Sequence, residues 1–174
     1  TGLTPLKMEN LRLADPTDPI TVALKPFIGP LSDEQRKQRD HLQFLGSLYM
    51  NGDGPAVPTV NIIASIQEGA AIKKKGTAVL RSVLPVGQYS RLDYPGPRKA
   101  EELWADPKFQ VAVLVLSKGR GAVRKVTPIF NQWTCEAEFE YVDDGGRNPG
   151  PHGRGRLLHH ARQHGGPDRI RHSH

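Results

Sequence analysis

The chain has 174 residues, enough for one domain with its own hydrophobic core. Its single cysteine, Cys135, excludes an intramolecular disulfide and favours a reducing compartment. No apolar run approaches the roughly 18 residues that cross a bilayer, so we expect no membrane partner. The net charge of +6 does not by itself indicate a nucleic-acid ligand, because the charge is unevenly distributed.

The positive charge is concentrated at the C-terminal end. Residues 145–174 contain six arginines, one acidic residue and six of the seven histidines. Residues 1–144 contain 18 basic and 17 acidic residues and are nearly neutral. We therefore predict a single domain over residues 1–144 and a basic tail over residues 145–174. Three hypotheses fit the tail: a polyanion-binding arm, a histidine-rich metal tract, or a disordered or out-of-frame end, which we favour.

The first quarter of the chain combines irregular and helical patterns. Residues 3–8 predict an edge strand, because Pro5 disfavours a central position. The proline-rich residues 13–30 predict a packed loop with one helical turn. Ser32 and Gln35 fit a capping box at the start of a helix over residues 32–50. Residues 51–54, Asn-Gly-Asp-Gly, then predict a turn.

A second helix follows this turn. Thr59 can cap it, and apolar residues at helical spacing form one buried face: Ile62, Ile63, Ile66, Ala70 and Ala71. Lys73, Lys74 and Lys75 lie in its last turn, and Gly76 suits the left-handed position after the helix. The three positive charges oppose the negative C-terminal end of the helix dipole. Two interpretations remain: the lysines only stabilise the helix end, or they also contact a phosphate.

From residue 77 the pattern changes to strands. We predict strands over residues 77–86 and 88–94, a short helix over 99–104, and three further strands over 109–117, 122–130 and 133–141. The apolar run 109–117 predicts a central strand covered on both faces. Residues 133–141 alternate apolar and polar side chains, which indicates a strand with one solvated face. The predicted fold class is α+β, with a mainly antiparallel sheet and helices on one face.

The sequence contains no glycine loop for nucleotides and no serine nucleophile elbow. Cys135 belongs to an apolar strand face, so we assign it to the core. Glu136, Glu138 and Glu140 at alternate positions could hold a hard cation, although a solvated strand face is the simpler interpretation. We expect no catalytic residue, no metal and no cofactor.

Basic residues form the remaining candidate site. They end the second predicted helix, begin the strand after it and flank a glycine-containing hairpin: Lys73, Lys74, Lys75, Arg81, Lys118, Arg120, Arg124 and Lys125. If the hairpin lies near the helix end, these side chains form a groove for a phosphate backbone. Tyr89 or Tyr94 could stack on bases in such a groove.

Several stretches carry a resemblance: "TPLKMENLRLADPTDPI", "FLGSLYMNGDGPAVP", "GPRKAEELWADPKF" and "VRKVTPIFNQW". Over residues 4–144 the chain resembles a family of small bacteriophage and prophage proteins of unassigned role, which implies the cytoplasm of a bacterial host. The same stretches are similar to the RAMP superfamily of CRISPR effector subunits. That similarity implies a ferredoxin-like, RNA-recognition-type fold that binds single-stranded RNA without a nuclease of its own.

We therefore expect a non-enzymatic protein of phage origin that binds single-stranded RNA or DNA. Two alternatives remain. One is a structural or assembly protein of the virion, which the near-neutral domain favours. The other is a metal-dependent nuclease that uses Glu136, Glu138 and Glu140. The sequence leaves homo-oligomerisation open.

Overall fold

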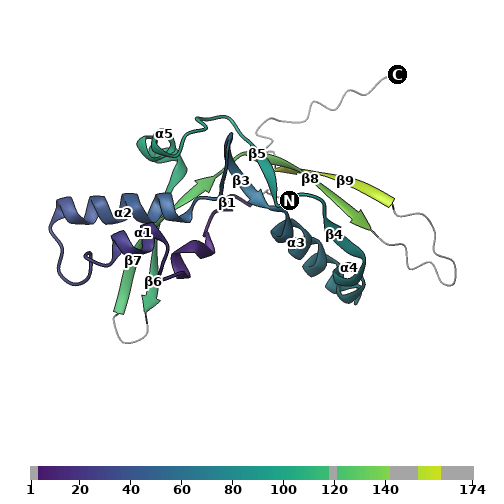
Figure 1. Cartoon of the computed structure of the whole chain (residues 1–174), viewed down its shortest axis with the longest axis horizontal. Helices are drawn as coiled ribbons and strands as arrows, with labels where there is room; N and C mark the ends of the chain where they lie inside the picture. Colours follow the sequence, from purple (N-terminus) through teal and green to yellow (C-terminus); the bar gives the residue numbers. More distant parts are fainter. Residues whose placement is uncertain (1–3, 118–120, 142–152, 162–174) are drawn as a thin grey trace, which may run out of the picture.

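The computed structural model describes residues 4–117, 121–141 and 153–161. These residues form an α+β structure, as predicted, but their antiparallel strands belong to two sheets instead of one (Figure 1). The helices of the described part are α1 (Pro19–Leu24), α2 (Asp33–Ser47), α3 (Thr59–Ala71), α4 (Gly76–Ser82) and α5 (Ala100–Ala105), with short 3-10 turns η1 (Leu11–Ala14) and η2 (Pro107–Phe109).

The first sheet has the order β1-β7-β6, with β1 (Leu6–Lys7), β7 (Gly121–Phe130) and β6 (Gln110–Ser117). Strands β6 and β7 pair over the whole length of β6 as an antiparallel hairpin. Helix α2 packs along β7. The prediction that residues 109–117 form a central strand is wrong, because β1 occupies the far side of β7 and leaves β6 at the edge.

The second sheet is built around β8 (Trp133–Tyr141). Strand β9 (Gly153–Ala161) pairs along the whole of β8 on one side. The other side of β8 is therefore shared by β5 (Tyr89–Asp93) and β4 (Val83–Pro85). Strand β5 also pairs with β3 (Gly54–Pro58), and β3 forms a hairpin with β2 (Met50–Asn51).

Strand β9 lies within the segment that was predicted as a tail. Residues 153–161 belong to the segment that the sequence analysis assigned to a disordered or out-of-frame end. In the structure their backbone forms nine antiparallel residue pairs with β8, from Trp133↔Ala161 to Tyr141↔Gly153. The division of the chain at residue 144 stays a prediction.

The connection through α3 and α4 differs from the expected ferredoxin-like arrangement. Strand β3 leads into α3, and α4 leads into β4 and then β5. Strand β3 is antiparallel to β5, and β4 and β5 are both antiparallel to β8, so the strands that α3 and α4 join, β3 and β4, run in opposite directions. A split β-α-β unit instead joins two parallel strands through its helix.

Local signals in the first half are confirmed. The Ser32 backbone N–H donates to Gln35 Oε1 at 3.0 Å, and the Gln35 N–H donates to Ser32 Oγ at 3.3 Å, which is the predicted capping box. Helix α2 ends at Ser47, before the predicted end, because Met50 already pairs in β2. The predicted turn over residues 51–54 joins β2 and β3, with Gly52 and Gly54 at φ of 32° and 140°.

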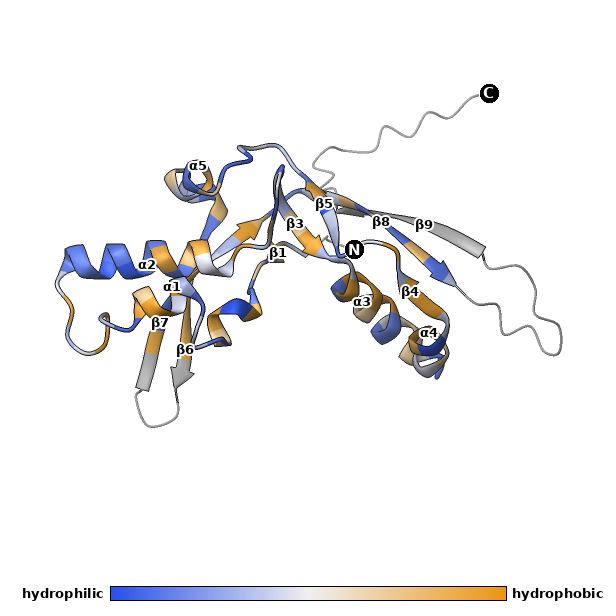
Figure 2. Cartoon of the chain, viewed as in Figure 1, coloured by the Kyte–Doolittle hydropathy of each residue, from blue (hydrophilic) through white to orange (hydrophobic). Residues whose placement is uncertain are grey.

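The core joins the two sheets through large side chains. Phe44 of α2, Leu92 of β5 and Phe130 of β7 are fully buried. The ring of Phe130 lies 4.8 Å from that of Tyr94 and 5.7 Å from that of Phe109, in edge and tilted geometries typical of packed aromatic cores. In Figure 2, the first turns of α2 are hydrophilic, whereas apolar residues appear at its end nearer the strands.

Residues 77–82 form helix α4, so the prediction of a strand from residue 77 is wrong. Gly76 begins this helix and is buried, and a Cβ there would lie 3.0 Å from the Gln67 carbonyl oxygen and 3.1 Å from Ala71 Cβ. Gly76 therefore permits close packing of α4 on α3. The left-handed residue after α3 is Lys74, at φ 58°, and not Gly76 as predicted.

Candidate functional site

Three predicted site residues lie on the α3–α4 turn, and a fourth, Arg81, lies in the last turn of α4. Helix α3 ends at Ala71, and the backbone N–H groups of Lys73 and Lys75 both donate to the Ala70 carbonyl, at 3.1 and 2.9 Å. The turn exposes the side chains of Lys73, Lys74 and Lys75, and α4 exposes Arg81. We call these four residues the cationic end.

Within the described part of the chain, the four side chains of the cationic end have no ion-pair partner. Residues 59–82 contain these four basic residues and one acidic residue, Glu68, which gives +3. The other residues of the segment 1–144 contain 14 basic and 16 acidic residues, which gives −2. The excess positive charge of this segment therefore lies at the α3–α4 turn.

Apolar side chains accompany these cations. Ile72 lies next to Lys73 and is 87% exposed, and Leu80 precedes Arg81 and is 60% exposed. Exposed apolar side chains beside unneutralised cations suit a ligand that offers both negative charge and apolar surface. Single-stranded nucleic acid has this combination, because its unpaired bases present their faces.

The cations of β7 have a different environment. Arg124 Nε lies 3.7 Å from Asp40 Oδ2 of α2, and Lys125 Nζ lies 3.6 Å from Glu9 Oε2. Lys125 thus has a carboxylate of its own, whereas Arg124 shares Asp40 with Arg39, which lies 2.9 Å from Asp40 Oδ1. Lys118 and Arg120, the remaining predicted site residues, lie outside the described residues.

The structure does not form the predicted groove between the helix end and the hairpin. Helices α3 and α4 pack with the second sheet, whereas Arg124 and Lys125 belong to the first sheet. Figure 1 places α3–α4 and the β6–β7 hairpin on opposite sides of the molecule. The sequence could not reveal this separation, because spacing along the chain does not determine which sheet each strand joins.

The two candidate stacking tyrosines differ. Tyr94 is 6% exposed, and burial raises its pKa to about 12. Its hydroxyl donates to the Pro97 carbonyl, and the Arg98 guanidinium lies 4.6 Å from its ring centre. Tyr94 therefore belongs to the core and does not present a free ring face. Tyr89 is half-buried and lines an open cavity of about 520 Å³ with Val60 and Gln88.

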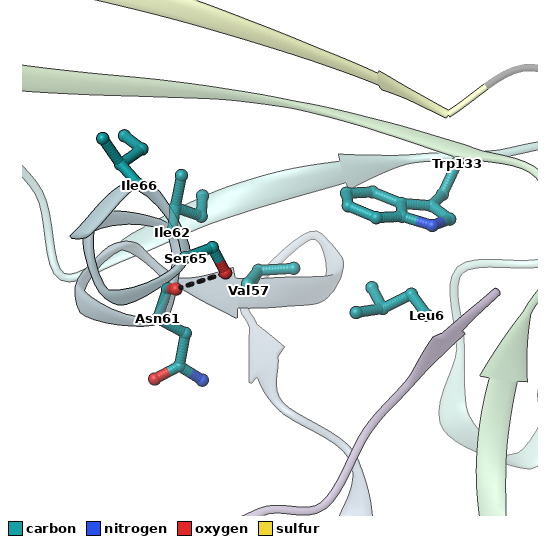
Figure 3. A pocket seen from close by; sticks show the side chains of 7 residues that line it. All are labelled: Leu6, Val57, Asn61, Ile62, Ser65, Ile66 and Trp133. Atoms are coloured by element: carbon teal, nitrogen blue, oxygen red, sulfur yellow. Dashed lines mark hydrogen bonds between the residues drawn. The ribbon is translucent and has the colours of Figure 1, made fainter. Parts of the chain in front are cut away.

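A second cavity, of about 310 Å³, lies where α3 faces β1 and Trp133 (Figure 3). Its interior is apolar, with Leu6, Val57 and Ile62 among its walls. Ser65 Oγ donates to the Asn61 carbonyl at 3.1 Å, so this hydroxyl is already used within α3. The cavity can accept an uncharged apolar group. The sequence analysis missed it, because its walls come from three separate segments.

The predicted acidic and thiol groups give no evidence of a reaction centre. Among the described residues, no group of three or more histidine, cysteine or acidic side chains could hold a metal ion. Cys135 is buried in β8, as predicted, and burial raises the pKa of its thiol to about 11. His41 Nε2 lies 2.8 Å from Glu101 Oε2, and its ring packs 5.0 Å from Trp104.

The chain was compared with protein-family models, curated proteins and solved structures. No protein-family model, curated protein or solved structure matches the chain. Within the described part of the chain, no helix combines the length and apolar character needed to cross a bilayer.

Proposed function

We propose that the chain binds single-stranded RNA or DNA without catalysing a reaction, through the cationic end. One observation carries this proposal: Lys73, Lys74, Lys75 and Arg81 are exposed on one helical hairpin and take part in no ion pair among the described residues. The resemblance to phage and prophage proteins suggests that this role belongs in a bacterial host cell.

Phosphate neutralisation would supply most of the affinity. Each phosphate contact releases condensed counterions, so the binding constant falls as the salt concentration rises. For single strands, the slope of log K against log salt concentration is about −0.7 per contact. Four contacts give a slope of about −3, so binding is expected at low salt and lost at high salt. The apolar side chains Ile72 and Leu80 beside the cations would contact bases without selecting a sequence.

Fluorescence anisotropy with labelled oligo-dT and oligo-U tests the proposal. The full chain is titrated at several salt concentrations, as wild type and as the triple variant Lys73→Ala, Lys74→Ala, Lys75→Ala. The triple variant should bind far more weakly at low salt, and its salt slope should be smaller by about 2. The two oligonucleotides show whether RNA or DNA is preferred.

A matched control removes the same charge elsewhere: Lys25→Ala, Lys37→Ala, Lys108→Ala, three exposed lysines on other elements. This control should bind nearly as well as wild type. Equal losses in both triple variants would indicate a general charge effect, and no binding by wild type at low salt would refute the proposal.

A second candidate function is a structural or assembly role that binds protein. The edge strand β6 favours it, because this strand exposes Leu114 and Val115, which are 75% and 45% exposed. A defined oligomer in the absence of nucleic acid, together with no oligonucleotide binding, would support this candidate over the first.

A further inference from the structure

We infer that two copies of this chain pair through β6, antiparallel and about a two-fold axis, to join their first sheets into one. The partner is therefore a second copy, and the contact lies away from the cationic end (Figure 1). The inference does not depend on nucleic-acid binding.

The first argument is the length of the free edge. Strand β6 has eight residues, all paired with β7 on one side, and no described strand pairs with its other side. Backbone N–H and C=O groups along such an edge can pair with another strand. A strand of this length can form a continuous ladder of backbone hydrogen bonds with a partner strand.

The second argument is the absence of the features that normally protect an edge. Strand β6 reads QVAVLVLS, without a charged residue, proline or glycine. Other described edges are short or interrupted: β1 and β2 have two residues each, and β4 has three and includes Pro85. Strand β9 carries two arginines in its sequence, Arg154 and Arg156. Natural proteins keep a long, uncharged edge mainly where something covers it.

The third argument is exposure on both faces of β6. Successive side chains of a strand point to opposite faces, so Leu114 and Val115 are exposed on opposite sides of the hairpin. Val123, which pairs with Val115, is also exposed, at 36%. The described part of the hairpin is largely apolar in Figure 2. Pairing with another strand would bring apolar neighbours to both faces at once.

The fourth argument concerns charge and identifies a second copy as the partner. An antiparallel two-fold contact opposes β6 to itself, and an uncharged strand meets no like charge in that arrangement. Among the described cations near β6, Lys125 lies 3.6 Å from Glu9 and Lys108 lies 3.9 Å from Asp106, whereas Arg124 shares Asp40 with Arg39. Across the joined sheet the two copies of β7 would lie about 14 Å apart, beyond the screening length at physiological salt.

The exposure of Leu114 determines the register that we propose between the two copies of β6. Leu114 is the most exposed apolar residue of β6, and we place it near the two-fold axis, where it packs against its counterpart. Leu114→Lys should then place two ammonium groups side by side at the centre of the contact. Because the wild-type side chain is already exposed, this change should leave the fold of each protomer intact.

Sedimentation velocity over a wide concentration range tests the inference on the full chain. Wild type should sediment as a dimer, and Leu114→Lys should remain monomeric at every concentration. The matched control is Leu11→Lys, which changes a residue 79% exposed on η1 and should remain dimeric. Circular dichroism verifies that both variants are folded.

A cysteine variant tests the register independently. Leu114→Cys should form a disulfide-linked dimer when diamide is added as the oxidant, whereas Leu11→Cys should not. The natural Cys135 contributes no background, because it is buried. A monomeric wild type, or a dimer that persists in Leu114→Lys, would overturn the inference. A dimer without cross-linking at residue 114 would overturn the register.

Discussion

The α3–α4 hairpin and the β6–β7 hairpin handle charge in opposite ways. At α3–α4, Lys73, Lys74 and Lys75 are exposed without an acidic partner among the described residues. At β6–β7, Lys125 lies 3.6 Å from Glu9, Arg124 shares Asp40 with Arg39, and Leu114, Val115 and Val123 are exposed. The difference shows that basic residues of one chain need not serve one site. We propose a polyanion as the ligand of the first region and another apolar strand as the partner of the second.

The largest expected effect is at the root of the β6–β7 hairpin. Phe130→Ala should lower the free energy of unfolding by about 3–5 kcal/mol, because Phe130 is fully buried between Tyr94 and Phe109. Leu80→Ala on α4 should change it by less than about 0.5 kcal/mol, because Leu80 is exposed. Denaturant unfolding measures both. Similar effects of the two substitutions would contradict the assignment of Phe130 to the shared core.

A pH-dependent effect is expected at β8, the strand that contacts α3. Burial raises the Cys135 pKa from 9.0 to about 11, so the folded state favours the protonated thiol. This contribution, at most about 3 kcal/mol, is complete below pH 9 and is lost as pH rises toward 11. The stability difference between wild type and Cys135→Ala, measured by denaturant unfolding, should therefore shrink over this range. A constant difference would show that the thiol is not buried.

An intermediate effect is expected at the α3–α4 contact. Gly76→Val would add atoms within about 3 Å of the Gln67 carbonyl oxygen, so the helices must separate. Overpacking of this kind typically lowers the free energy of unfolding by about 1–3 kcal/mol. The variant should also bind oligonucleotide more weakly, because the cationic end is displaced. A more stable variant with unchanged binding would show that α4 does not pack closely on α3.

A smaller effect is expected at Lys74 of the cationic end, where a substitution should weaken binding without lowering the free energy of unfolding. Lys74→Gly removes one cation at a left-handed position, φ 58°, which glycine adopts without strain. The salt slope of oligonucleotide binding should fall by about 0.7, while the free energy of unfolding should not decrease. A binding loss accompanied by destabilisation would instead point to a structural role for Lys74.

The smallest effect is expected at Arg124. Arg124→Ala should change the free energy of unfolding by less than about 1 kcal/mol, because its contact with Asp40 is long and half-exposed. The salt slope of oligonucleotide binding should remain that of wild type. A slope reduced as much as in Lys74→Gly would show that β7 also contacts phosphates.

Local signals predicted much of the fold. The Ser32–Gln35 capping box, the turn over residues 51–54 and the alternation along β8 each depend on neighbouring residues, and each is present in the structure. Errors arose where tertiary contacts decide. Residues 77–82 favour a strand by composition, yet they form a helix that begins at Gly76 and packs closely on α3. Strand β6 is apolar enough for a central position but lies at an edge.

The candidate site was predictable only in part. The lysine triplet and Arg81 belong to one short helical hairpin, so their place on the same hairpin follows from local structure. Arg124 and Lys125 are distant because their strand belongs to the other sheet, which no local pattern specifies. Neutralisation by Asp40 and Glu9 is likewise invisible in the sequence, because these acids come from remote segments.

The central claim is that the two hairpins act as separate surfaces. Sedimentation velocity of a fluorescently labelled single strand, mixed with wild type or with Leu114→Lys at low salt, tests it most directly. The account predicts that both proteins bind with the same affinity per protomer, and that only wild type carries the strand on a dimer. Loss of strand binding in Leu114→Lys, with its fold intact, would contradict the separation.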